Sequence, residues 1–111
     1  MLGNGLSHKV SVYVPSTDHD KALSDSDNTA NVESVLVALS KQFGGATALQ
    51  TLGGFMGNDS LITEKITLVY SYLEEVTEST LIFLESLAHE IKTRQNQESV
   101  AVEIDSTLYF V

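Results

Sequence analysis

The sequence has no cysteine and one proline, and only 6 basic residues stand against 15 acidic ones. The absence of cysteine excludes disulfides, thiolate metal sites and a cysteine nucleophile, and fits a cytoplasmic protein. The formal net charge of −9 argues against direct binding to nucleic-acid phosphates or to an anionic membrane. No apolar run approaches the roughly 18 residues of a membrane span, and the segment from Met1 to Lys9 lacks the apolar stretch of a signal peptide.

What is present suits one small globular domain. The chain has 111 residues, of which 42% are hydrophobic and 7% aromatic, so we expect a single domain over residues 1–111 with an aliphatic core. A first strand is predicted over His8–Val14, because hydrophobic and polar residues alternate there, and Pro15 ends it. A long acidic loop is then predicted over residues 16–31.

Two amphipathic helices are predicted. The apolar spacing from Val32 to Phe43 indicates the first helix, with Gly44 as its C-cap and an N-cap among Asn28, Thr29 and Asn31. The second helix is predicted over Glu78–Arg94, with Thr77 as N-cap and basic residues in the last turn.

Three further strands are predicted over Ala46–Leu52, Leu61–Tyr72 and Ser99–Phe110. In the second of these we expect the apolar alternation to face the core, through Ile62, Ile66, Leu68, Tyr70 and Tyr72. In the last strand the expected core residues are Val100, Val102, Ile104, Leu108 and Phe110.

The order βαββαβ predicts an α+β, ferredoxin-like sandwich: a four-stranded antiparallel sheet in the order 4-1-3-2, with both helices on one face. The other face would then be open and polar, with Ser11, Tyr13, Thr63, Lys65, Thr67, Ser71, Glu103 and Thr107. This face either meets water or stacks on a second copy in a homodimer. The apolar residues for such an interface would be Leu49, Val69, Tyr13 and Tyr109.

The same fold gathers three loops at one end of the sheet, where binding sites are often found. A ligand site there would draw on polar and aromatic side chains, with Arg94 meeting an anionic group and Phe55 or Tyr13 stacking on a ring. The predicted ligand residues are Tyr13, Ser16, Thr17, His19, Phe55, Arg94, Gln97 and Glu98.

Familiar catalytic and cofactor motifs do not occur. The run Asp18-His19-Asp20 lacks the glycine and glutamate spacing of an EF-hand, so no metal site is predicted. Gly44-Gly45-Ala46-Thr47 lacks the P-loop lysine, and no GxSxG elbow is present. We therefore predict no cofactor and name no catalytic residue.

The acidic surface suggests the leading functional hypothesis: a non-enzymatic binding or inhibitory protein that covers a basic, nucleic-acid-binding protein partner. Its partner-binding residues would be Asp18, Asp20, Asp25, Asp27, Glu74, Glu75 and Glu78. The second hypothesis is a protein that binds or sequesters a small anionic, nucleotide-like molecule. The third is a small enzyme that uses His19 or Glu98 as a base.

Four segments together resemble a group of small bacterial and mobile-element proteins with which no activity is associated. They are Val12–Thr17, Phe43–Thr47, Glu64–Tyr72 and Gln97–Ile104. The resemblance spans most of the chain and implies an accessory role in a bacterium, plasmid or phage.

Overall fold

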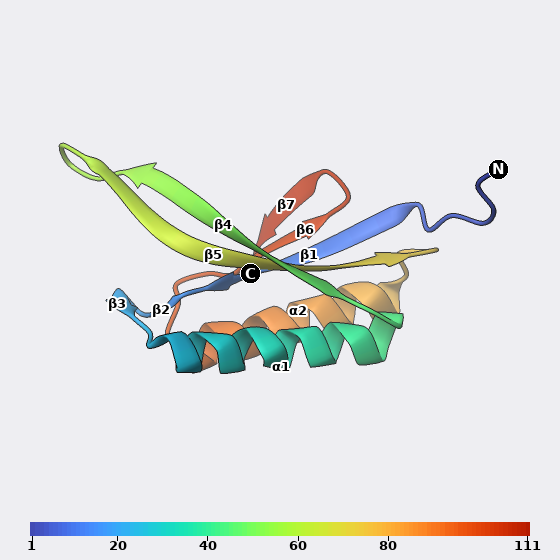
Figure 1. The fold of residues 1–111 in the computed structure, drawn as a ribbon, viewed down its shortest axis with the longest axis horizontal. Helices are drawn as coiled ribbons and strands as arrows, with labels where there is room; N and C mark the ends of the chain where they lie inside the picture. The colour runs from blue at the N-terminus through green and yellow to red at the C-terminus, as the bar shows by residue number, and fades with distance from the viewer.

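The computed structural model describes residues 1–111, with two helices and seven strands (Figure 1). In chain order these are β1 (His8–Pro15), β2 (Thr17–Asp18), β3 (Lys21–Ala22), α1 (Asp25–Phe43), β4 (Thr47–Met56), β5 (Leu61–Leu73), α2 (Glu78–Arg94), β6 (Ala101–Ile104) and β7 (Thr107–Phe110).

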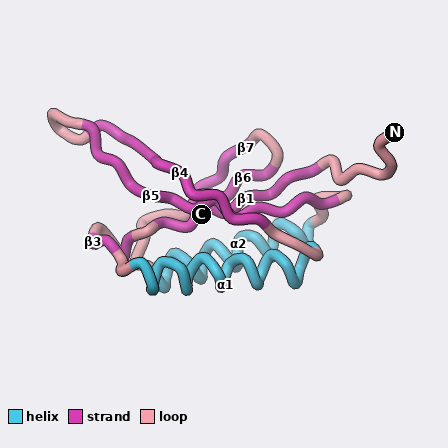
Figure 2. Tube along the Cα trace, viewed as in Figure 1, coloured by secondary structure: helices cyan, strands magenta, loops and turns pink.

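The main sheet has five strands in the order β4-β5-β1-β6-β7, and every neighbouring pair is antiparallel. Both helices lie on one side of it (Figure 2). The α+β prediction is thus confirmed, but the sheet has five strands rather than four. The extra strand arises because the predicted strand Ser99–Phe110 is broken by a turn at Asp105, whose φ of 55° reverses the chain.

Helix α1 begins seven residues before the predicted Val32, at Asp25. Ser24 is its N-cap, because the Ser24 hydroxyl accepts a hydrogen bond from the Asp27 amide at 3.1 Å. The N-cap predicted among Asn28, Thr29 and Asn31 was wrong. Gly44 ends the helix in the left-handed conformation, with φ of 92°, as predicted.

Helix α2 has the predicted bounds and the predicted N-cap. The Thr77 hydroxyl accepts from the Thr80 amide, and the Thr80 hydroxyl accepts from the Thr77 amide, each at 3.2 Å. This reciprocal capping box uses threonine where glutamate or glutamine is usual.

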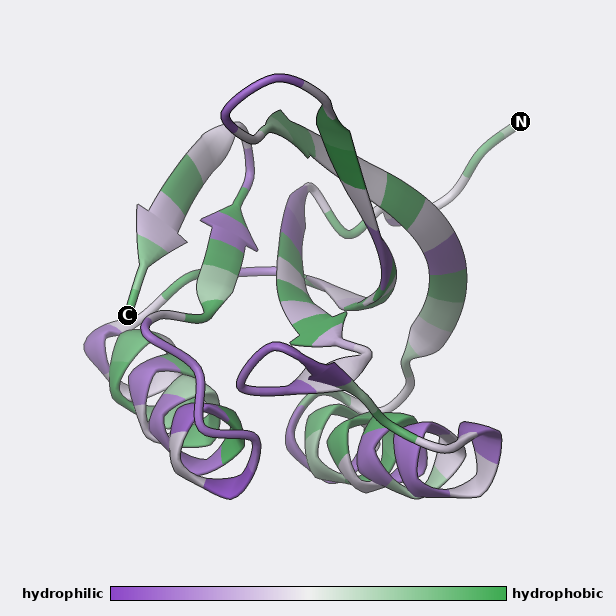
Figure 3. Cartoon of the chain, turned by 90° about the vertical axis from the view of Figure 1, so that its left-hand side faces the viewer, coloured by the Kyte–Doolittle hydropathy of each residue, from purple (hydrophilic) through white to green (hydrophobic).

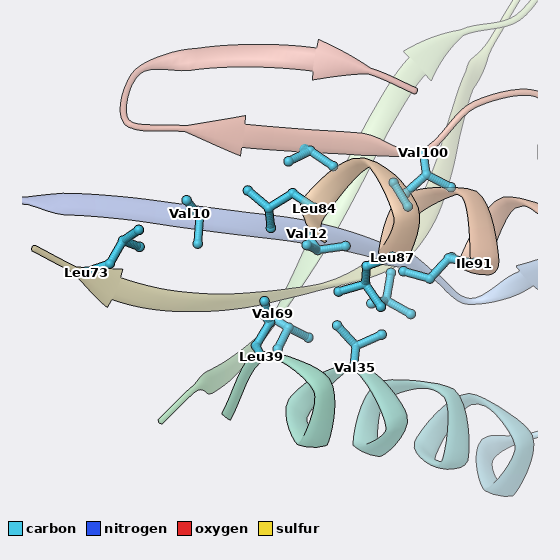
Figure 4. Packing of buried hydrophobic residues seen from close by; sticks show 13 residues of the cluster. Val10, Val12, Val35, Leu39, Val69, Leu73, Leu84, Leu87, Ile91 and Val100 are labelled. Carbon is cyan, nitrogen blue, oxygen red and sulfur yellow. The ribbon is translucent and has the colours of Figure 1, made fainter. Parts of the chain in front are cut away.

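The core lies between the sheet and the helices (Figure 4). On β1, the side chains of Val10, Val12 and Val14 are fully shielded from solvent and face both helices. Around them pack Val35, Leu39, Val69, Leu73, Leu84, Leu87, Ala88, Ile91, Val100 and Val102.

The face of β5 that packs against the core is the opposite of the predicted one. Val69 pairs with Val12 in the register, is fully buried, and places its neighbours Thr67 and Ser71 on the helix side with it. Ser71 tolerates burial because its hydroxyl donates to the Gly45 carbonyl at 2.6 Å. The predicted core residues Ile62, Ile66, Leu68, Tyr70 and Tyr72 therefore face away from the helices.

Strand β7 departs from the prediction in the same way. Tyr109 pairs with Val102 and shares its face, while Leu108 pairs with Glu103. Leu108 is 43% exposed and Phe110 is 71% exposed, so neither belongs to the core.

We call the sheet face away from the helices the open face. Its alternating side chains are largely apolar, contributed by β4 (Leu49, Phe55), β5 (Ile62, Ile66, Leu68, Tyr70, Tyr72) and β7 (Leu108, Phe110). In Figure 3 the green of hydrophobic residues recurs along these strands. The predicted polar character of this face, with Thr67 and Ser71 on it, was wrong.

The β4–β5 hairpin extends past the helices at one end, and the N-terminal segment extends past them at the other (Figure 1). The molecule therefore has a long axis, with overall dimensions of 50 × 26 × 26 Å. Phe55 and Met56 near its tip are 58% and 70% exposed. Neither helix combines the length and the apolar character needed to cross a bilayer.

Candidate functional site

Three loops are predicted to meet at one end of the sheet, and two of them do: the segment after β1 and the segment after α2. The His19 amide donates to the Gln95 carbonyl at 2.8 Å, and Asn96 Nδ2 donates to Asp18 Oδ1 at 2.8 Å. Gln95 is 2% exposed, and its amide donates to the carbonyls of Pro15 and Thr17. These contacts fasten the segment after β1 to the segment after α2.

Three of the predicted ligand residues lie in this junction. Gln97 Nε2 is 3.1 Å from the Thr17 carbonyl, 3.3 Å from Thr17 Oγ1 and 3.5 Å from the His19 carbonyl. The Thr17 hydroxyl in turn donates to Glu64 Oε1 at 2.9 Å. Because these polar groups already bind one another, the junction holds the loops together.

The remaining predicted ligand residues do not converge on that point. Arg94 contacts Ser34 of α1, with Nη1 3.5 Å from the hydroxyl, and Phe55 lies on the β4–β5 hairpin. Ser16 and Glu98 make no side-chain hydrogen bond, and Tyr13 lies on the open face. A ligand role for these residues stays a prediction.

Tyr13 has a partner on the open face that the sequence did not single out as a site residue. Its hydroxyl lies 3.5 Å from Glu103 Oε1 on β6, and the register places Glu103 directly opposite Ser11. Ser11 is 1% exposed, while Tyr13 and Glu103 are half-buried. Burial, together with the nearby Glu103 carboxylate, raises the pKa of Tyr13.

One signal in the sequence could have found Glu103. It is the lone acidic residue between Val102 and Ile104, on a strand whose other face is buried. A carboxylate on a half-buried strand is held in place by the pairing of that strand with its neighbours.

Aromatic rings on the open face also hold a cation. The Lys9 ammonium lies 4.2 Å from the centre of the Tyr70 ring and 5.7 Å from that of Tyr72. The two rings pack edge to face, with centroids 5.9 Å apart. This geometry is a cation–π arrangement.

A cavity of about 510 Å³ lies on the helix side, between α2 and the β6–β7 hairpin. Its walls are mostly apolar, and its polar side chains are Glu85, His89 and Tyr109. It offers few hydrogen-bonding groups to a polar ligand.

The acidic residues predicted to bind a protein partner are spread over several elements. Asp25 and Asp27 occupy the first turn of α1, and Glu78 the first turn of α2, where the helix dipole favours negative charge. Asp18 accepts the hydrogen bond from Asn96. Asp20, Glu74 and Glu75 are exposed.

No family model and no curated protein matches the sequence. Among solved structures, a phage SAM lyase in the apo state superposes with a TM-score of 0.67 and 20% identity, covering 100% of this chain and 95% of that chain. A phage SAM lyase in complex with S-methyl-5′-thioadenosine superposes with a TM-score of 0.68 and 18% identity, covering 97% of this chain and 91% of that chain.

These neighbours contradict the leading functional hypothesis. Both are described as enzymes, so the expectation of a non-enzymatic binding or inhibitory protein directed at a basic partner was wrong. The error came from interpreting the net charge as a docking surface, although several of the carboxylates serve the ends of helices. Over nearly its whole length, this chain shares its fold with a phage SAM lyase.

Proposed function

We propose that the protein is a lyase that cleaves S-adenosylmethionine and releases S-methyl-5′-thioadenosine. The observation that carries this proposal is the likeness in fold across 97% of this chain to a lyase holding that nucleoside. The phage source of the neighbours agrees with the accessory role expected from the sequence. Action on a cytoplasmic metabolite would agree with the expected cytoplasmic location.

The reaction makes modest chemical demands on the protein. The carboxylate oxygen of the methionine part attacks its own Cγ while the bond from Cγ to the sulfonium sulfur breaks. The electron pair of that bond returns to sulfur, which leaves as a neutral thioether, and the other product is homoserine lactone. No water or proton is consumed, so orientation of the carboxylate is the main requirement.

The charge of the protein supports a substrate of this kind. S-adenosylmethionine carries a net positive charge at neutral pH, whereas the thioether nucleoside is neutral. A chain with a net charge of −9 attracts the cationic substrate and has no such attraction for the neutral thioether nucleoside.

On the open face, Tyr13 and Glu103 supply a carboxylate for the cationic groups of such a substrate. The Glu103 carboxylate is oriented by the Tyr13 hydroxyl, 3.5 Å away, and faces no basic side chain in an ion pair. It is therefore free to meet the ammonium group or the sulfonium of the substrate. Of the ligand residues predicted from the sequence, this proposal retains Tyr13.

A second copy of the chain would complete the site. The open face carries three charged residues, Lys9, Glu64 and Glu103, out of 21 in the sequence, and many exposed apolar ones. Two copies of charge −9 repel least where this charge-poor face meets its counterpart. A small ligand also needs most of its surface covered, which one sheet face left open to solvent does not do.

This self-association keeps the homodimer prediction but changes its residues. Leu49 and Tyr13 lie on the open face as predicted. Val69 is fully buried in the core, and Tyr109 shares the helix side with Val102, so neither contributes.

The test is incubation of the purified protein with S-adenosylmethionine, followed by chromatographic detection of S-methyl-5′-thioadenosine. Glu103→Gln should lower kcat/KM about a hundredfold, equivalent to about 2.7 kcal/mol of lost stabilisation. Glu74→Gln, which removes an exposed carboxylate, is the matched control and should leave kcat/KM unchanged. Absence of the nucleoside from the wild-type reaction would refute the proposal.

A further inference from the structure

A second, smaller cavity lies on the helix side of the sheet, between the first turn of α1 and the β4–β5 pair. Its volume is about 330 Å³. We call it the Lys65 pocket, and its walls are formed by Asn28, Gln50, Thr51, Leu52, Lys65, Ile66 and Thr67. Unlike the cavity beneath the β6–β7 hairpin, it is lined mostly by polar residues.

Lys65 is the one charged residue of this pocket, and it forms no ion pair. Its ammonium is therefore available to an anionic group that enters the pocket. Its neighbour on the same face is Thr67, which is 5% exposed and whose hydroxyl makes no hydrogen bond within the protein. A ligand with an anionic group would meet both.

Asn28 supplies an unsatisfied acceptor on the opposite wall. Its Oδ1 is shielded from solvent and has no hydrogen-bond partner, which makes it the only such side-chain atom in the chain. Buried acceptors without partners are rare in folded proteins because they lose their bonds to water. Because Oδ1 is closed to solvent, the Asn28 side chain must turn towards the pocket before a donor group on a bound ligand can satisfy it.

We propose that the Lys65 pocket binds an α-amino acid group, with the carboxylate at Lys65 and the ammonium donating to Asn28 Oδ1. A zwitterion supplies the anion and the donor together, and its zero net charge avoids repulsion by a chain of charge −9. A phosphate dianion would meet a single cation here, against that repulsion. The volume of about 330 Å³ accommodates an amino acid more readily than a nucleotide.

This pocket and the Tyr13–Glu103 pair lie on opposite sides of the sheet, so the inference does not depend on the proposed lyase activity. The amino acid group could belong to a free amino acid or to a larger molecule such as S-adenosylmethionine. The two sources share the chemistry that Lys65 and Asn28 recognise, and they differ in whether the adenosyl group can be accommodated.

The experiment is titration of the full-length, isotope-labelled protein with L-methionine, followed by NMR. The expected result is a set of saturable shifts at the amides of Asn28, Gln50, Lys65 and Thr67. Lys65→Met should weaken methionine binding at least tenfold, while Lys65→Arg should retain most of it. Lys41→Met, which removes an exposed lysine from the last turn of α1, is the control and should bind as wild type.

Asn28→Leu distinguishes a role of Asn28 in binding from a role in stability, because the two roles predict different changes in melting temperature and affinity. The variant loses an acceptor that has no partner, so its melting temperature should stay equal or rise, while its affinity for methionine should fall at least tenfold. A fall in both quantities would contradict the proposed role of Asn28.

The source of the amino acid group is resolved by two further titrations. S-methyl-5′-thioadenosine has no amino acid group and should leave the pocket amides unshifted. Shifts with methionine alone identify a free amino acid, and shifts with S-adenosylmethionine as well identify the larger molecule. The inference is overturned if methionine shifts none of these amides, if Lys65→Met binds as tightly as Lys41→Met, or if inorganic phosphate displaces methionine.

Discussion

The hydroxyl of Tyr13 lies 3.5 Å from Oε1 of Glu103, although the two residues are 90 positions apart in the chain. They come from neighbouring strands, β1 and β6, and both point away from the helices. The contact places the Tyr13 hydroxyl beside a carboxylate at the middle of the open face. That carboxylate is the central element of the site we propose.

Tyr13→Phe should lower kcat/KM for S-adenosylmethionine about tenfold, because Glu103 loses the group that orients it but keeps its charge. The melting temperature should change little, since the ring stays in place and the lost hydrogen bond is long and half-buried. Steady-state kinetics with Tyr109→Phe as the control would check this. Equal activities for the two variants would remove Tyr13 from the site.

Asp105 predicts an acid-sensitive contribution to stability. The hydrogen bond from His8 Nδ1 at 2.9 Å, and then that from the Lys9 amide at 3.1 Å, hold the pKa of Asp105 below its ordinary value of 3.8. Because the pKa in the folded state is the lower one, the contribution is complete above pH 3.8 and is lost as pH falls through the folded-state value.

Urea unfolding of Asp105→Asn at a series of pH values would measure this effect. Asparagine also accepts the left-handed conformation of this turn, where φ is 55°, so backbone strain is not added. The stability difference from wild type should be larger at pH 6 than at pH 3. A difference that does not vary with pH would show that the Asp105 contacts contribute nothing through ionisation.

Which face of β5 meets the helices can be tested by making the same substitution, valine to alanine, at a buried and at an exposed position. Val69→Ala should destabilise the protein by about 2 kcal/mol, because Val69 is fully buried against Val12 and α1. Val37→Ala, on α1 at 52% exposure, should cost less than about 0.5 kcal/mol. Similar losses in denaturant unfolding would contradict the register of β5 against β1.

That register also shows where sequence interpretation succeeded and where it failed. The alternation of Val10, Val12 and Val14 predicted the core face of β1, and Thr77 and Arg94 marked the ends of α2. In β5 the apolar alternation belongs to the open face, whereas Val69 sits in the core between Thr67 and Ser71. Periodicity identified the strand, but it could not distinguish a face buried by helices from an apolar face left open.

Two other differences have local causes. Residues 25–31 lack apolar spacing, so the first turns of α1 resemble a loop, although Ser24 with Asp25 and Asp27 is a typical helix start. The candidate site was only partly foreseen. Thr17 and Gln97 were placed correctly at one end of the sheet, but the Tyr13–Glu103 contact depends on the pairing of β1 with β6, which sequence spacing does not reveal.

Self-association through the open face predicts a response to single charges. Leu49→Lys and Leu108→Lys should each shift the protein towards the monomer, because an ammonium would be buried between two apolar surfaces. Ile82→Lys, at a 60% exposed position of α2, should leave the oligomeric state unchanged. Analytical ultracentrifugation distinguishes these outcomes, and a wild-type monomer at all concentrations would exclude the second copy.

The most direct test of the central claim is the fate of the methionine-derived carbon chain when the protein converts S-adenosylmethionine in oxygen-labelled water. Mass spectrometry should find S-methyl-5′-thioadenosine together with an unlabelled homoserine lactone, because the attacking oxygen comes from the carboxylate of the substrate. Labelled homoserine with no lactone at early times would identify a hydrolase, and intact S-adenosylmethionine would show that the protein does not catalyse this cleavage. Either result would contradict the proposed lyase mechanism.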